Sequence, residues 1–309
     1  MRLLAISIDL DEIPCYTAIH GLPVPEPSAA QAIYRCAVPR FEALFEELGA
    51  RGTFFAVGQD LRDPHAADAI GRLHRAGHEI GNHSFHHRYD LTRRDAQAIR
   101  QDIADGAAAI TAVTGEPPRG FRAPGYTVTD TLLEQVRDVG ARYDSSVFPC
   151  PPYYGAKALA MSTIALRGRT SRSVLDTPRV LTAPTDPYRI GAHYTQRGDG
   201  LLELPIGVTS RASGQLPFIG TSVALSSERT ARWLARRIAH RPLVNFELHG
   251  IDLCDAELDG LQFLAPHQVD LRRSLEHKRR SLLAAVRELQ NAGYELVTLA
   301  DAAERFATE

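Results

Sequence analysis

The chain has 309 residues, of which 44% are hydrophobic and 23% charged, and its formal net charge at pH 7 is −2. These proportions are typical of globular domains and exclude disordered, collagen-like and membrane-embedded classes. The 35 basic and 37 acidic side chains leave no positive excess for a phosphate backbone, so nucleic acid is not an expected partner.

Short apolar runs alternate with longer segments of helical period along most of the chain. This alternation is typical of repeated βα units around a parallel sheet, and about seven or eight units predict one α/β barrel spanning residues 1–309. In chain order, the predicted elements are a strand at Leu3–Ile8, a helix at Pro39–Leu48, a strand at Thr53–Val57, a helix at Pro64–Ala76, a strand at Glu79–Asn82, a helix at Thr92–Val113, a strand at Gly120–Arg122, a helix at Asp130–Val139, a strand at Leu202–Pro205, a helix at Ser227–Ala239, a strand at Leu243–Leu248, a helix at Asp270–Asn291 and a strand at Glu295–Leu299.

Two segments interrupt the alternation, residues 13–30 and residues 148–200. The first begins IPCYTAIHGLPVPEP, with four prolines, and the second is rich in Pro, Gly, Ser and Thr. Long irregular loops inside compact domains usually carry binding or lid functions. We therefore expect both segments to be irregular insertions at the substrate-facing rim of the barrel.

The amino-terminal sequence MRLLAISIDLDE reaches charged residues after a short apolar run, which does not fit a signal peptide or a spanning helix. No later stretch is apolar over the ~18 residues that a transmembrane segment needs. These features predict a cytoplasmic protein without a transmembrane segment. The cysteines show no CxxC spacing and are expected to be reduced thiols; they are Cys15, Cys36, Cys150 and Cys254.

Two carboxylates follow the first predicted strand. Asp9 and Asp11 are two residues apart, so in an extended chain their side chains point to the same face. Neighbouring carboxylates repel each other unless a cation or an arginine neutralises them. The pair therefore suggests a cation site, and the structural alternative is that it begins a loop and caps a helix.

Three histidines lie within five residues after the third predicted strand, in GNHSFHHRYDL. His83 and His87 are four residues apart, which on one helical turn brings both imidazoles to the same side; His86 is also a neighbour of His83 on a helix. These histidines and the aspartate pair share the carboxyl end of the predicted sheet. Two imidazoles with one carboxylate form a catalytic rather than a structural ligand set, because coordination stays open for water and substrate.

Two further polar residues end predicted strands. Arg122, in GFRAPGY, can orient a carboxylate through a bidentate hydrogen bond, although it could also lie at the surface. His249 follows the apolar strand of VNFELHG and places another titratable imidazole at the same end of the sheet.

The order of these segments resembles the polysaccharide deacetylase (NodB-homology) family of metal-dependent amidohydrolases, of the carbohydrate esterase type. The resemblance is carried by SIDLD at 7–11, HSFHH at 83–87, FRAPGY at 121–126, YDSSVFP at 143–149 and LHG at 248–250. It implies a distorted (β/α)7 TIM-like barrel with long substrate-side loops. It also implies a divalent metal, with zinc as the first expectation and cobalt, nickel or manganese compatible with the same ligands.

Residue by residue, the resemblance implies that His83 and His87 bind the metal together with Asp11. It assigns Asp9 as the catalytic base. The family usually has two adjacent aspartates, whereas Leu10 separates them here, so the opposite assignment of base and ligand stays open.

The resemblance gives the remaining site residues supporting roles. Arg122 would tether the base, His249 would be the general acid, and Asp144 would tune that histidine. Tyr126 lies one residue later than the tyrosine of the family's motif, where the backbone amide would stabilise an oxyanion. The implied substrate and oxyanion residues are Pro124, Gly125 and Tyr126.

We expect a hydrolase that removes an N-acetyl or N-formyl group from a sugar or from a glycan precursor linked to a nucleotide or a lipid. The alternatives are hydrolysis of a cyclic amide or imide on the same barrel, and a barrel that binds metal or carbohydrate without catalysis. Tyr153 and Tyr154 favour a sugar, because aromatic rings stack on pyranose faces. A homo-oligomer stays open. Residues expected to be structural or solvated are Cys15, His20, His86 and His267.

Overall fold

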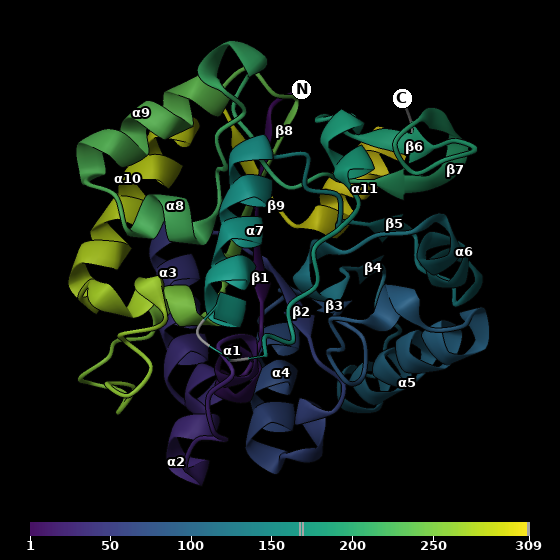
Figure 1. Ribbon diagram of the computed structural model, residues 1–309. Helices are drawn as coiled ribbons and strands as arrows, with labels where there is room; N and C mark the ends of the chain where they lie inside the picture. Colours follow the sequence, from purple (N-terminus) through teal and green to yellow (C-terminus); the bar gives the residue numbers. More distant parts are fainter. Residues whose placement is uncertain (167, 169, 308–309) are drawn as a thin grey trace.

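The structure is a computed structural model that describes residues 1–166, 168 and 170–307. The described residues form one curled sheet of nine strands in the order β6-β7-β5-β4-β3-β2-β1-β8, with β9 pairing with β1 (Figure 1). The strands are β1 (Leu3–Asp9), β2 (Thr53–Ala56), β3 (Glu79–Asn82), β4 (Gly120–Phe121), β5 (Tyr143–Asp144), β6 (Tyr188–Ile190), β7 (Arg197–Glu203), β8 (Leu243–His249) and β9 (Glu295–Val297).

The strand register brings polar strand ends together. All pairings in the sheet are parallel except that of β6 with β7. Asp9 at the end of β1 is opposite Phe55 of β2 on one side and His249 of β8 on the other. Residues from distant parts of the sequence therefore meet at the carboxyl edge of the sheet.

The segment after β7 joins the two ends of the curled sheet. Gly207 donates its backbone N–H to the carbonyl of Asn245 in β8 at 2.9 Å, and Ile219 forms a parallel bridge with Glu247. Leu204 donates to the carbonyl of Asp144 in β5 at 2.9 Å. The arrangement matches the distorted barrel predicted from the sequence, and that fold prediction is confirmed.

Helices cover the outside of this sheet (Figure 1). α10 packs on α9 and α8, and α5 packs on α6. Every residue of β1 is buried, because strands of a parallel sheet are covered on both faces. The helices are α1 (Ile13–Ile19), α2 (Pro27–Ala30), α3 (Val38–Leu48), α4 (Pro64–Arg75), α5 (Ala96–Thr114), α6 (Asp130–Asp138), α7 (Pro151–Leu166), α8 (Gly220–Ala224), α9 (Glu228–Ile238), α10 (Leu275–Asn291) and α11 (Leu299–Ala307).

Short turns of 3₁₀ or π type connect these elements. The π turn is η1 (Ile33–Ala37), and the 3₁₀ turns are η2 (Asp60–Arg62), η3 (Leu91–Arg93), η4 (Pro124–Tyr126), η5 (Pro178–Thr182), η6 (Arg211–Ser213), η7 (Gly250–Leu253) and η8 (Val269–Arg272).

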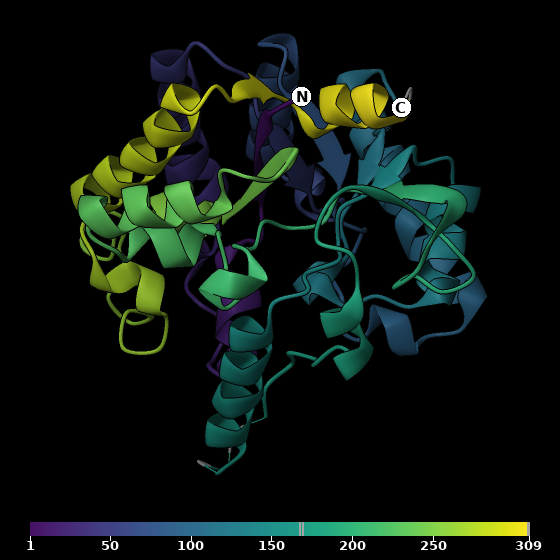
Figure 2. The same cartoon turned by 90° about the horizontal axis from the view of Figure 1, so that it is seen from above.

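The two rim segments contain regular structure, so the prediction that they are irregular was wrong. Residues 13–30 hold α1 and α2, and each helix has a proline in its first turn, where a missing N–H costs nothing. The described part of 148–200 holds α7, η5, β6 and the start of β7. Residues 167 and 169 lie outside the described residues. Figure 2 shows α7 standing out from the body on the side opposite the chain ends.

Among the described residues, none of the helices is both long enough and apolar enough to cross a membrane.

Candidate metal centre and its neighbours

The carboxylate pair ends β1 and the turn after it. Asp9 and Asp11 are both buried, with 1% and 4% of their surfaces exposed. Both face His83: its Nε2 lies 3.8 Å from Asp9 Oδ2 and 3.2 Å from Asp11 Oδ1. The expectation that the two aspartates share a face holds. The alternative, in which they cap a helix, is not realised: the capping side chain of α1 is Glu12.

The histidines lie in a loop after β3, so the predicted helical turn is wrong. The backbone of Ser84 and His87 has positive φ, 64° and 50°, which no α-helix allows. Asp102 of α5 fixes the loop, because its carboxylate accepts the backbone N–H groups of Phe85 at 2.8 Å and His86 at 3.1 Å. Gly106 of α5 lets the loop approach closely, since an added Cβ would lie 2.8 Å from the carbonyl carbon of Ser84.

Asp11, His83 and His87 converge on one point. Asp11 Oδ1 lies 3.2 Å from His83 Nε2 and 3.1 Å from His87 Nε2. Yet Asp11 Oδ1 and both ring nitrogens of His87 are buried without a hydrogen-bond partner among the described residues. Unpartnered buried donors and acceptors are costly. Asp11, His83 and His87 each bring one ligand atom to within 4.8 Å of the others, an arrangement that suits a divalent cation, so the three residues fit a metal.

The electrostatics of this group agree with a cation site. Burial raises the pKa of Asp11, but the facing His87 and His83 outweigh it and hold that pKa well below its usual range. His83 donates its Nδ1–H to the carbonyl of Arg122 at 2.7 Å, which leaves Nε2 facing the carboxylates. This second contact fixes the ring orientation of a ligand histidine.

The neighbouring candidates lie outside the group. His86 Nδ1 contacts Asp102 Oδ2 at 2.9 Å, so His86 supports the loop and is not the partner of His83 in the group. Cys15 is a free thiol whose pKa is raised by burial, and it is not among the converging ligands.

Arg122 and Asp9 form a buried ion pair. Arg122 is fully buried, and its Nη1 donates to Asp9 Oδ1 at 2.8 Å. The other guanidinium nitrogens donate to Ser145 O, Ser145 Oγ and Ser7 Oγ at 2.8–2.9 Å. The guanidinium also lies 4.3 Å from the centre of the Phe55 ring. Arg122 therefore fixes the Asp9 carboxylate in position, and the surface alternative for this arginine is excluded.

His249 is held by Glu247 and not by Asp144. His249 Nδ1 lies 3.0 Å from Glu247 Oε1, and Glu247 is fully buried. Burial lowers the pKa of His249, but the Glu247 carboxylate outweighs it and raises that pKa well above its usual range. Asp144 instead accepts from the N–H and hydroxyl of Ser146, both at 2.9 Å, and faces Glu203. The expectation that Asp144 contacts the acid histidine is corrected, because the Asp144 carboxylate is directed to Ser146 and Glu203 instead.

Tyr126 approaches the site through its hydroxyl. Its backbone N–H donates to Ala123 O at 3.1 Å, so this amide is engaged in a turn and is not the expected oxyanion donor. The Tyr126 hydroxyl lies 3.3 Å from His249 Nε2. Pro124 is buried and accepts from Thr127 Oγ1 at 3.2 Å, and the carbonyl of Gly125 accepts from the Lys157 ammonium at 2.9 Å.

The residue that sequence reasoning missed is Glu247. It lies inside an apolar strand, VNFELH, two residues before His249 and therefore on the same face. A charged residue inside a buried strand was the signal that could have identified it. Ser7, Ser145 and Asn245, which surround Arg122, are small polar residues that the chain also buries completely.

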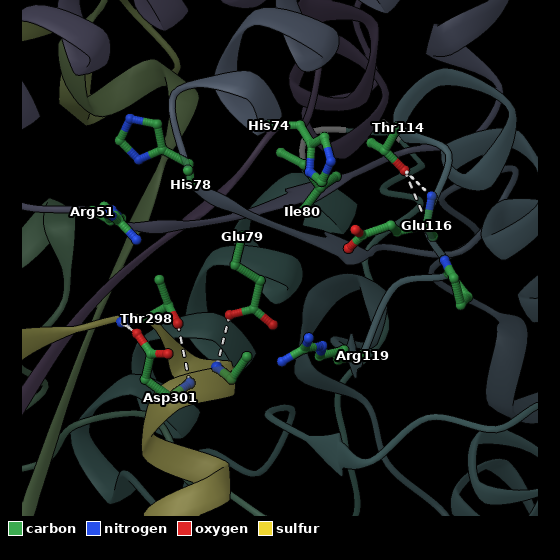
Figure 3. A pocket seen from close by; sticks show the side chains of 13 residues that line it. Arg51, His74, His78, Glu79, Ile80, Thr114, Glu116, Arg119, Thr298 and Asp301 are labelled. Carbon is green, nitrogen blue, oxygen red and sulfur yellow. Dashed lines mark hydrogen bonds between the residues drawn. The ribbon is translucent and has the colours of Figure 1, made fainter.

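A separate cavity of about 220 Å³ lies at the amino-terminal end of the sheet (Figure 3). The half-buried Glu79 carboxylate in this cavity accepts from Tyr143 at 2.7 Å and from Thr53 and Ala300 at 2.8 Å. This end of a barrel usually serves stability. The cavity is therefore not the candidate catalytic site.

Comparison with known proteins confirms the family resemblance. Residues 30–143 match the family model described as polysaccharide deacetylase, a range that includes the histidines of the loop and Arg122 but not the aspartate pair or His249. A peptidoglycan-N-acetylglucosamine deacetylase of Bacillus cereus is 30% identical over 103 residues, which are 33% of this chain and 46% of that protein. The peptidoglycan-N-acetylmuramic acid deacetylase PdaA of Bacillus subtilis is 38% identical over 90 residues, 29% of this chain and 33% of that protein.

These matches span less than half the length of either relative. Among solved structures, a Mycobacterium smegmatis protein classed with the polysaccharide deacetylases aligns with 98% of this chain and 90% of its own, at a TM-score of 0.58 and 20% identity. That likeness establishes the shared fold.

Proposed function

We propose, from the match of residues 30–143 to the polysaccharide deacetylase family model, that this chain is a metal-dependent hydrolase that removes an N-acetyl or N-formyl group from a sugar or glycan precursor. The observation that carries the proposal is the convergence of Asp11, His83 and His87 on one point, with no hydrogen bond to satisfy Asp11 Oδ1 or the His87 ring.

Asp11, His83 and His87 would hold the metal, with zinc as the first candidate. A divalent ion bound there supplies a Lewis acid that polarises the acyl carbonyl and makes water more acidic. The remaining chemistry belongs to side chains of this protein.

Asp9 acts as the general base in this proposal. Its Oδ1 is occupied by Arg122 at 2.8 Å, while its Oδ2 faces His83 at 3.8 Å, toward the metal ligands. A carboxylate fixed by one oxygen keeps the other free to accept the proton of the attacking water. The same geometry supports Asp11 as the ligand, because Asp11 contacts both histidines.

His249 acts as the general acid. Glu247 keeps it protonated through Nδ1, and its Nε2 lies on the side of Tyr126, where a proton can pass to the leaving amine. Its side chain is 24% exposed, so it can reach a bound substrate. Glu247 thus takes the supporting role that the resemblance assigned to Asp144.

Aromatic rings beside His249 favour a sugar substrate. The rings of Tyr126 and His249 are 6.0 Å apart, and Tyr153 and Phe148 pack against Tyr126 at 6.0 and 5.7 Å. Such rings offer flat apolar faces, on which the C–H groups of a pyranose can pack.

The test is a mass-spectrometric screen of the zinc-loaded protein against N-acetylchitooligosaccharides and N-formyl amino sugars. We expect loss of an acetyl or formyl group. Asp9→Asn should retain zinc but lose turnover, whereas His86→Ala, which changes a neighbouring histidine outside the converging group, should remain active. A fully zinc-loaded protein that deacylates nothing in the panel, or that hydrolyses cyclic imides instead, would refute the proposal.

A further inference from the structure

α7 presents apolar side chains to solvent beyond its first turn, from Leu159 to Leu166. None of its residues is buried; Leu159 and Leu166 are 69% and 89% exposed. A helix that is apolar on all sides is normally buried in a protein core or in lipid. The described part of this chain does not bury α7, so its apolar side chains need another surface to cover them.

The polar side chains of α7 bond to the protein itself. The hydroxyls of Ser162 and Thr163 donate to the carbonyls of Ala158 and Leu159, four residues earlier, at 2.9 and 2.8 Å. Lys157 donates to the carbonyl of Gly125 at 2.9 Å. These groups therefore do not need water, which suits a helix that lies against an apolar phase.

α7 begins at the candidate site and extends away from it. Tyr153 in its first turn packs on Tyr126, which contacts His249. From there the helix projects beyond the body (Figure 2). Between α7 and the segments around His20 and Pro266 lies a groove of about 370 Å³, lined by His20, Ala156, Leu159, Ala160, Thr163, Ile164, Pro266, His267 and Arg272. None of the described residues that line this groove is acidic.

The charge of this region differs from that of the rest of the chain. Residues 145–175 contain no Asp or Glu and four basic residues, Lys157, Arg167, Arg169 and Arg172, although the whole chain carries a net charge of −2. Arg172 is exposed. An apolar helix beside the exposed Arg172 and, in the groove, Arg272 is complementary to an anionic bilayer, whose headgroups attract these arginines while the acyl region covers the leucines.

We propose that α7 and this groove form a docking surface for an anionic lipid bilayer, which holds the candidate site at the membrane surface. A second copy of the chain fits less well, because it would bring two basic segments together. Docking by α7 would turn the site toward N-acyl sugars carried on lipid. The binding itself needs neither metal nor substrate, so it stands apart from the proposed function.

The test is co-sedimentation of the full chain with vesicles of equal parts phosphatidylglycerol and phosphatidylcholine, compared with pure phosphatidylcholine. We expect binding to the anionic vesicles that weakens as salt is raised. The double variant Leu159→Glu/Leu166→Glu should lose about tenfold or more in partitioning, because two apolar contacts are replaced by charges that the lipid repels. Trp233→Glu is the matched control: this residue is 41% exposed on α9 and should bind as the unaltered chain does.

Three results would overturn the proposal. They are equal partitioning to both vesicle types, undiminished binding of the double variant, and a concentration-dependent dimer that the double variant abolishes, which would assign α7 to self-association. Thermal unfolding of the variants establishes that they fold. Release of acetate from a water-soluble N-acetylchitooligosaccharide should be unchanged in the double variant, so loss of docking and loss of deacetylation are distinguishable.

Discussion

Replacing Arg122 with Met should destabilise the protein by about 3–5 kcal/mol, the usual cost of removing one partner from a buried ion pair. The structure supports the upper part of this range. Both Arg122 and Asp9 are almost inaccessible to solvent, and the arginine makes four hydrogen bonds that methionine cannot replace. The Asp9 carboxylate would then be buried without its counter-charge.

The expected shift in melting temperature follows from chain length. A chain of 309 residues has an unfolding entropy of roughly 0.65 kcal/mol per kelvin, so the loss corresponds to about 5–8 °C in a calorimetric scan. Asp9→Asn, which removes the charge left behind, should rescue part of this loss. We expect the Asp9→Asn/Arg122→Met double variant to be about 2 kcal/mol more stable than the sum of the single effects predicts.

Two outcomes would refute this reasoning. Additive single effects would mean that Arg122 and Asp9 do not interact in solution. A melting temperature unchanged by Arg122→Met would mean that the guanidinium is not buried as described. The zinc content of Arg122→Met, measured by elemental analysis, should stay at that of the unaltered chain, because the metal ligands are other residues.

Three further predictions test other parts of the site and fold. Asp11→Asn should reduce bound zinc to background in elemental analysis, since it removes the only carboxylate ligand; full zinc content would contradict the ligand assignment. Glu247→Gln should lower the pKa of His249, so the basic limb of the pH–rate profile moves to lower pH, whereas Asp144→Asn should leave that limb in place; the reverse pattern would restore the role first given to Asp144. Burial lowers the pKa of His78 to about 4 from 6.5. Between those values the unfolded chain binds a proton that the folded chain does not, so stability should fall by roughly 3 kcal/mol as pH drops from 6.5 to 4. In His78→Gln, denaturation at several pH values should lack this part of the slope, and an unchanged slope would contradict the assignment.

The site was largely foreseeable from the sequence, because strand ends are local features. Asp9, Arg122 and His249 each follow an apolar run, and the carboxyl ends of parallel strands must meet at one edge. The alternation of apolar runs and helical periods likewise predicted the barrel. The roles of the site residues remain predictions that the variants above test.

Other features were decided only by the tertiary structure. The sequence spacing of His83 and His87 suggested a helical turn, but Asp102 and Gly106 of the following helix, α5, impose a loop with positive φ. The four-residue spacing of His83 and His87 could not exclude His86 as the second ligand. Only the geometry of the loop shows that His87 lies beside His83 and Asp11, whereas His86 contacts Asp102.

Sequence by itself therefore determined which side chains reach the carboxyl edge, since strand period and parallel pairing are fixed by local pattern. Tertiary structure decided which of them touch. Asp144 and His249 do not touch, because the Asp144 carboxylate is directed to Ser146, whereas Arg122 after β4 reaches across to Asp9 at the end of β1. Contacts between strands depend on sheet order, and no local pattern in this chain encodes that order.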